Sequence, residues 1–143
     1  MTVAAGTRTR RLGPDDAGAL AELSQRLGGA ETPEQWASYL ARPSTVAIGA
    51  LAGSVIVGYA AGDVRTGFGM PAPTAWVEQF GVDLAWRARG VGWTLAQELL
   101  RCFREKGAAH AYTVVPLHDR VLGPFFRQLG FRDELLACLG CRL

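Results

Sequence analysis

Residues 87–93 read Arg-Ala-Arg-Gly-Val-Gly-Trp and join two segments with different apolar periodicity. Thr74–Val82 is rich in the β-branched and aromatic residues of a strand, whereas Val91–Glu105 has apolar residues every four positions, as on one face of a helix. The two glycines let the backbone approach a ligand closely, because they have no Cβ, and the first N–H groups of the helix point toward the same space. The segment therefore predicts a turn that binds a phosphate or diphosphate, with Arg87 and Arg89 as additional cations. The alternative is a turn that binds nothing.

Two common nucleotide-binding motifs do not match this turn. The phosphate loop of nucleoside triphosphatases requires Gly followed by Lys-Ser or Lys-Thr, and no glycine of the chain precedes such a pair. The dinucleotide-binding fingerprint requires a further glycine where this chain has Leu95. Neither of these nucleotide-binding classes is predicted.

The segments on either side of the turn predict one α/β (α+β) domain over residues 1–143, a length that suffices for one core. Thr32-Pro33-Glu34-Gln35 reads as a capping box that starts a helix, and Asp15 is expected to cap the helix before it. A tight turn at Gly53-Ser54 predicts a hairpin, and later connections are crossovers, so the central sheet should be mixed. The predicted strands are Thr7–Leu12, Thr45–Leu51, Ser54–Val64, Thr74–Val82, Ala109–Val115 and Leu136–Leu143, and the predicted helices are Asp15–Leu27, Pro33–Arg42, Val91–Glu105 and Leu122–Leu129.

Composition and charge restrict the class of protein. Apolar residues make up 49% of the chain and charged residues 20%, as in globular proteins. The formal net charge of +2 is too small for binding nucleic acid through bulk positive charge. No apolar run approaches the roughly 20 residues of a membrane helix, and Met1–Leu12 contains no apolar stretch of the signal-peptide type. We therefore expect a cytoplasmic protein with no nucleic-acid or membrane partner.

The three cysteines, Cys102, Cys138 and Cys141, cannot all pair, which argues against a disulfide scaffold. The last two have the spacing of a Cys-x-x-Cys motif. A zinc site would need two more ligands, for which only His110 and His118 are present, and a redox motif would open a helix rather than lie in a predicted strand. We therefore expect buried, inert thiols and no metal site.

Taken together, these elements resemble the GNAT superfamily of acetyl-CoA-dependent N-acetyltransferases. The family signature (Q/R)-x-x-G-x-(G/A) follows a bulged strand, and Arg87-x-x-Gly90-x-Gly92 matches it at that place. Val-Gly-Tyr at residues 57–59 is similar to the family's I-V-G-(F/Y), and Phe-Arg-Gln-Leu-Gly-Phe at residues 126–131 is similar to Y-x-x-L-G-F. The matches occur in the family's order and span nearly the whole chain.

The resemblance implies a fold as well as an activity. In the family the sheet splays apart between two strands, here Thr74–Val82 and Ala109–Val115, and the pantetheine arm of acetyl-CoA lies in the opening. The amides of the helix start hold the diphosphate, and a backbone N–H near Val82 polarises the acetyl carbonyl. The resemblance thus implies these cofactor-binding residues: Phe80, Gly81, Val82, Arg87, Ala88, Arg89, Gly90, Val91, Gly92, Trp93, Asp119 and Phe126.

The family's reaction is the direct attack of a primary amine on the thioester, which requires the amine to lose a proton first. Carboxylates on the signature strand serve as the general base in some members, so the resemblance makes Glu78 the candidate base. Asp63, His110 and His118 are weaker alternatives. Glu78 could equally be an outward-facing strand residue or the partner of an arginine.

Two positions depart from the family. The tyrosine that often protonates the departing CoA thiolate aligns with Phe126, and an asparagine that contacts the cofactor aligns with Asp119. Phe126 has no exchangeable proton and cannot be a general acid, although a thiolate whose pKa is about 8.5 can leave without one. Tyr112 or His118 could substitute if they face the opening. An alternative function is therefore an acyl-CoA-binding sensor or interaction module with little or no transferase activity.

The chain is less informative about the acceptor amine and about partner proteins. Trp76, Trp86 and Trp93 cluster around the candidate site and are either core residues or the lining for an acceptor with an apolar or cationic body. Members of the family often dimerise through C-terminal strands, and Leu135–Leu139 is apolar enough for such a homodimer interface or for the sheet core. The chemical identity of the acceptor does not follow from the sequence.

Overall fold

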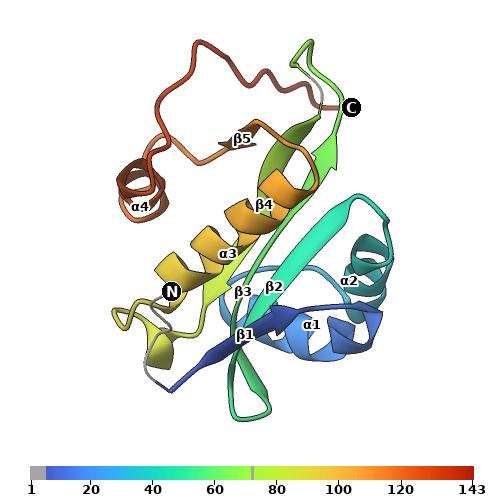
Figure 1. Ribbon diagram of the computed structural model, residues 1–143, viewed down its shortest axis with the longest axis vertical. Coiled ribbons are helices and arrows are strands. Elements are labelled where there is room, and N and C mark those ends of the chain that lie inside the picture. The colour runs from blue at the N-terminus through green and yellow to red at the C-terminus, as the bar shows by residue number, and fades with distance from the viewer. Residues whose placement is uncertain (1–5, 72) are drawn as a thin grey trace.

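The computed structural model describes residues 6–71 and 73–143, which form one mixed sheet of five strands (Figure 1). The strands are β1 (Arg8–Arg11), β2 (Thr45–Ala52), β3 (Val55–Arg65), β4 (Thr74–Val82) and β5 (His110–Thr113). They lie in the order β1-β2-β3-β4-β5, with antiparallel pairing up to β4 and parallel pairing between β4 and β5. The mixed α/β sheet expected from the sequence is confirmed.

The helices within the described ranges are α1 (Ala17–Arg26), α2 (Pro33–Leu40), α3 (Val91–Glu105) and α4 (Leu122–Gln128), with short 3-10 turns η1 (Pro14–Asp16) and η2 (Leu84–Trp86). They cover both faces of the sheet (Figure 1). The apolar stripe of α3, which includes Leu95, Leu99 and Phe103, is buried against one face. A second buried apolar cluster lies beneath α1 and α2 on the opposite face of the sheet, and it includes Ala47 and Tyr59. None of the helices in this part of the chain is long and apolar enough to span a membrane.

The prediction that Asp15 caps the first helix is wrong. η1 comes first, and α1 begins at Ala17 with Asp16 as the N-cap residue. The Asp16 carboxylate accepts hydrogen bonds from the Arg10 guanidinium at 2.8 and 3.0 Å and from the Gly13 N–H at 2.9 Å. These bonds, that of Arg10 above all, lower the pKa of Asp16 below its ordinary value. Asp16 rather than Asp15 thus fixes the segment before α1, because its carboxylate lies within hydrogen-bonding distance of Arg10 on β1.

Two other local predictions are confirmed. Thr32 Oγ1 accepts from the Gln35 N–H at 3.2 Å, and Gln35 Oε1 accepts from the Thr32 N–H at 2.8 Å, so the capping box forms at the start of α2. Gly53 adopts a φ of +62° in the turn that joins β2 to β3, as tight hairpins favour. Both features depend on residues within a few positions of one another.

The prediction of a closing strand over Leu136–Leu143 is wrong. The described chain contains no strand after β5, and residues 132–143 are exposed. Cys138 and Cys141 are therefore exposed too, which corrects the expectation of buried thiols for this pair, whereas Cys102 is buried. A strand needs a neighbouring strand for its backbone hydrogen bonds, and apolar composition alone does not supply that neighbour.

Candidate active site

The sheet opens at the middle of β4. In the pairing of β3 with β4, Ala61 lies opposite Gln79 but Gly62 lies opposite Val77, so Glu78 is an extra residue that forms a β-bulge. β5 pairs with only the first four residues of β4, ending at Val77. Beyond that point the described residues provide no strand on this side of β4. The bulge and the splay that the resemblance implied therefore lie at the same place.

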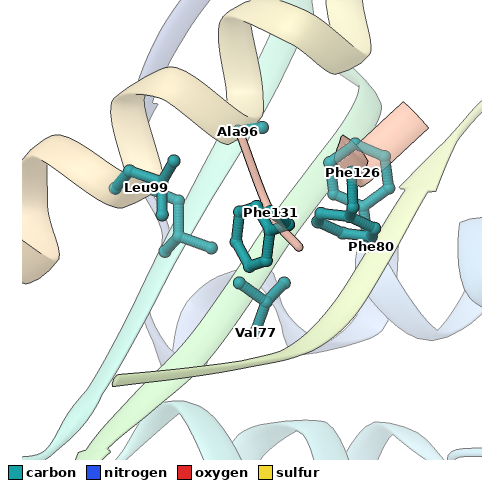
Figure 2. A pocket seen from close by; sticks show the side chains of 7 residues that line it. Val77, Phe80, Ala96, Leu99, Phe126 and Phe131 are labelled. Atoms are coloured by element: carbon teal, nitrogen blue, oxygen red, sulfur yellow. The ribbon is translucent and has the colours of Figure 1, made fainter. Parts of the chain in front are cut away.

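Aromatic side chains close the opening on the side of α3. The ring of Phe80 on β4 lies 5.1 Å from that of Phe125 and 5.7 Å from that of Phe126, both on α4. Phe126 also contacts Phe131 at 5.1 Å and is only 5% exposed. Figure 2 shows three of these rings with aliphatic side chains of β4 and α3 around a pocket that is too narrow for a water molecule. This end of the candidate site is an apolar wall.

The turn between β4 and α3 has a left-handed backbone. Ala88 and Gly90 have φ values of +60° and +82°, which glycine adopts without strain and alanine does not. Gly90 is the N-cap residue of α3, and its carbonyl accepts hydrogen bonds from the Thr94 N–H and hydroxyl, both at 3.1 Å. The N–H groups of residues 91–93 precede this first intrahelical donor, so they are the unpaired amides of a helix start. Such amides, together with the helix dipole, favour an anion at the open end of β4.

The two predicted cations of the turn contact other groups of the protein. Arg87 Nε donates to the Val82 carbonyl at 3.1 Å, and the Arg89 guanidinium lies over the Trp86 ring at 4.9 Å from its centroid. Both arginine residues are exposed, so their charges still contribute to a positive potential at the turn. These contacts also stabilise the conformation of the turn itself.

The remaining predicted cofactor residues differ in their surroundings. A Cβ at Gly81 would lie 2.8 Å from the Leu27 side chain and 2.8 Å from the Tyr59 hydroxyl, so a larger residue there would require both side chains to move. Trp93 is 39% exposed at the start of α3. Asp119 Oδ1 accepts from two backbone N–H groups at the start of α4, each at 2.8 Å, and these bonds lower its pKa. Within the described ranges, no three His, Cys, Asp or Glu side chains lie close enough to hold a metal ion.

Glu78, the candidate base, lies in a hydrogen-bonded cluster at the bulge. Its carboxylate accepts from the Tyr39 hydroxyl of α2 and from the Arg65 guanidinium of β3, each at 3.1 Å. Arg65 also donates to Asp63 at 3.3 Å. Burial, and then the charge of Glu78, raise the pKa of Tyr39 above its ordinary value, so its hydroxyl stays protonated and donates. Glu78 is thus the partner of an arginine, as one interpretation of the sequence had it, and its role as a base stays a prediction.

Tyr112 lies across the sheet from Phe126. It stands opposite Trp76 in the pairing of β4 with β5, with ring centroids 5.2 Å apart, and His110 stacks on it at 6.4 Å. Neighbouring residues of a strand point to opposite faces, and Val77 is buried beneath α3. Trp76 and Tyr112 therefore face away from α3. His118, the other suggested substitute for the family's tyrosine, is exposed in the segment before α4.

Sequence reasoning missed Tyr39 and Arg65, and it did not single out Phe68 within the loop over residues 67–73, which the family resemblance places beside the acceptor cleft. Arg65 carried a weak signal, because it follows Asp63 at the two-residue spacing that places strand residues on one face. Tyr39 carried none, since it is 39 positions away from Glu78 and on a helix. The glycines and prolines of residues 67–73 predict a loop, but they do not predict that the Phe68 ring contacts Trp76.

The family model for acetyltransferases (GNAT) matches residues 19–131 of the chain, while no curated protein sequence matches it. The aminoglycoside acetyltransferase meta-AAC0020 from an uncultured soil metagenomic sample has a similar structure, with a TM-score of 0.82 at 20% identity over 96% of this chain and 97% of the other. The aminoglycoside N-acetyltransferase AAC(6')-Iy in complex with CoA gives 0.82 at 17% identity over 95% and 94%. Ribosomal-protein-alanine N-acetyltransferase from Brucella melitensis gives 0.80 at 15% over 96% and 99%. At these identities the likeness concerns the fold.

Proposed function

Because the chain belongs to the GNAT family of acetyltransferases, we propose that it is an N-acetyltransferase that moves the acetyl group of acetyl-CoA onto a primary amine. The observation that carries this proposal is the position of the α3 amides. The left-handed turn at Gly90 starts α3 beside the half of β4 that has no β5 partner, since a Cβ at Gly92 would lie 3.3 Å from the Phe80 ring. The use of acetyl-CoA is supported by similar folds crystallised with CoA and with the bisubstrate analogue CoA-S-monomethyl-acetylneamine.

The proposed cofactor site follows the open edge of β4. The amides of residues 91–93 hold the diphosphate, with Arg87 and Arg89 nearby. The pantetheine arm pairs with backbone groups of residues 80–82, and an N–H near Val82 polarises the acetyl carbonyl. Because the rings of Phe80 and Phe125 are in contact, 5.1 Å apart, the arm has to displace them to enter.

The proposed chemistry needs one base and no covalent enzyme intermediate. The lone pair of the neutral amine attacks the thioester carbon, the C–S bond breaks, and the electron pair leaves on sulfur as the CoA thiolate. Glu78 accepts the proton that the ammonium form loses before the attack, directly or through water. The second N–H proton, which the nitrogen loses as the amide forms, passes to solvent water. Phe126, enclosed by other phenylalanine rings, donates no proton to the thiolate. With a thiol pKa of about 8.5, the thiolate leaves without that proton.

The experiment measures acetyl-CoA binding and transfer separately. Acetyl-CoA at a hundredfold excess over its Kd should raise the free energy of unfolding by about 2.7 kcal/mol, a Tm increase of about 5–10 °C for a chain of this size. Release of the CoA thiol is then followed over a panel of primary amines. Glu78→Gln should lower kcat about 10²–10⁴-fold without changing the stabilisation by acetyl-CoA, whereas Glu22→Gln, at an exposed position of α1, should change neither.

Two outcomes contradict the proposal. An unchanged Tm in saturating acetyl-CoA would show that the turn does not hold the cofactor. Stabilisation without thiol release on any amine would indicate an acyl-CoA-binding module instead of a transferase.

We further propose that the protein acts in the cytoplasm, where acetyl-CoA is present, and that it forms a homodimer. The support for the dimer is the apolar segment Leu135–Leu139, in which Leu135 and Leu139 are 104% and 90% exposed. Light scattering on the purified chain should give twice the monomer mass, and a monomer mass would contradict the dimer.

A further inference from the structure

Phe68, Trp76 and Tyr112, which we call the aromatic platform, lie together on the face of the sheet opposite α3. The rings of Phe68 and Trp76 are 5.3 Å apart, and those of Trp76 and Tyr112 are 5.2 Å apart. α1 and α2 lie on this face but away from β5 (Figure 1). Among the described residues, the buried cluster beneath these helices includes none from β4 or β5. The platform is therefore left uncovered by the helices.

Packing does not explain the position of Phe68. Its side chain is 78% exposed, and its φ of +53° lies in the left-handed region, between Gly67 and Gly69. A phenylalanine in this conformation is strained, and an exposed ring regains little through burial. The loop nevertheless holds this ring against Trp76. An aromatic ligand on the platform would cover both rings, and the apolar area buried in this way would offset the backbone strain at Phe68.

The platform ends at the carboxylate cluster of the bulge. The Arg65 guanidinium lies over the Trp76 ring, 5.7 Å from its centroid, and donates to Glu78 and Asp63. Asp63 is directly opposite Trp76 in the pairing of β3 with β4, so the two side chains point to the same face. Glu78 follows Trp76 by two residues on the same strand, about 7 Å away along it. An aromatic surface and two carboxylates are thus within the length of one small molecule.

Asp63 retains acceptor capacity at this place. It is 5% exposed, and its Oδ1 has no hydrogen-bond partner among the described residues, since Arg65 donates to Oδ2. A buried carboxylate oxygen without a donor is unfavourable, and an ammonium group brings three donors. Arg65 offsets one of the two negative charges of Asp63 and Glu78. The cluster therefore matches a single cation better than several.

Building on the proposed transferase activity, we propose that the acceptor is an arylalkylamine, a primary amine joined by a short alkyl chain to an aromatic ring. The ring lies on the aromatic platform, where tilted ring contacts are favourable. The ammonium group lies at Glu78 and Asp63, and Glu78 takes its proton before the nitrogen attacks the thioester. A polycationic acceptor such as an aminoglycoside fits less well, because Arg65 repels its additional charges.

The test compares kcat/KM for four amines at saturating acetyl-CoA. Phenethylamine and tryptamine carry a ring, hexylamine has the same charge and no ring, and neamine is a polycation. We expect kcat/KM for the two arylalkylamines to exceed that for hexylamine about tenfold or more, mainly through a lower KM.

Phe68→Ala tests the platform without disturbing the core, because Phe68 is 78% exposed. The KM for phenethylamine should rise about two- to tenfold, the effect of one aromatic contact, while the KM values for acetyl-CoA and hexylamine stay unchanged. Phe68→Tyr keeps the ring and should keep the wild-type KM. Val55→Ala removes an apolar side chain that is 62% exposed at the β2–β3 hairpin and should alter none of these constants.

The outcomes separate this inference from the proposed function. A kcat/KM for hexylamine or neamine equal to or above that of the arylalkylamines overturns the acceptor class and leaves the transferase standing. An unchanged phenethylamine KM in Phe68→Ala also overturns the inference, because the ring would then take no part in recognition. If acetyl-CoA stabilises the protein but no amine is acetylated, the proposed function fails and the acceptor class fails with it.

Discussion

Two substitutions in the turn before α3 should have opposite effects on stability. Ala88 and Gly90 have φ values of +60° and +82°. Alanine in this region costs about 1–2 kcal/mol more than glycine, and its lower entropy in the unfolded chain offsets about 0.4–1 kcal/mol of that. Gly90→Ala should therefore lower the free energy of unfolding by about 1 kcal/mol. Ala88→Gly should raise it by a similar or smaller amount.

Gly92→Ala is the matched control for Gly90→Ala. A Cβ at Gly92 would lie 3.3 Å from the tip of the Phe80 ring and 3.6 Å from the Phe125 ring, which small ring movements accommodate. A Cβ at Gly90 would meet no described atom within 4 Å, so the effect there is backbone strain alone. Within a helix, alanine is favoured over glycine by about 0.5–1 kcal/mol. Gly92→Ala should therefore leave stability unchanged or raise it slightly.

Urea denaturation with a common m-value measures these differences. The two Gly→Ala variants should differ by about 1.5 kcal/mol, or roughly 3–6 °C in Tm. Acetyl-CoA titration supplies a second readout, in which Gly90→Ala binds more weakly because its strained turn displaces the α3 amides. Gly92→Ala should bind normally, since the family signature accepts alanine there. Equal stability of the two variants would refute the strain argument, and equal affinity would refute the role of the turn in binding.

Asp16→Asn should lower the free energy of unfolding by about 1 kcal/mol at neutral pH, by weakening the charged hydrogen bonds with Arg10 and the Gly13 N–H. The folded-state pKa of Asp16 is below its ordinary value of 3.8. The difference in free energy of unfolding between wild type and Asp16→Asn should therefore be complete above pH 3.8 and vanish as the pH falls through the lowered pKa. A difference that does not change with pH down to about pH 2 would contradict this. Phe126→Tyr should destabilise the protein by about 1–3 kcal/mol, because the new hydroxyl enters an apolar wall, and should not raise kcat. A faster enzyme of unchanged stability, measured by initial rates and urea denaturation, would instead place position 126 beside the thiolate.

Much of the secondary structure was predictable because it depends on neighbours in the chain. The helix α3 has the predicted bounds, Val91–Glu105, since its apolar period and the preceding Gly90 lie within one segment. The capping box of α2 likewise needs only four consecutive positions. Predictions failed where a distant partner decided the outcome. The side chain of Asp16, rather than that of Asp15, reaches Arg10 of β1, and Leu136–Leu143 finds no strand to pair with in the described chain.

The features of the candidate site also fall into those predictable from neighbouring residues and those set by distant contacts. The sequence by itself determined the glycine turn at the start of α3 and the place of Glu78 on the strand before it, because both belong to one contiguous stretch with a recognisable spacing. Only the tertiary structure decided that Tyr39 and Arg65 bind the Glu78 carboxylate, that rings of β4 and α4 close the opening beside it, and that Phe68 lies against a tryptophan. These contacts join separate elements, and they depend on how side-chain shapes and charges fit in space, which residue spacing along a chain does not encode.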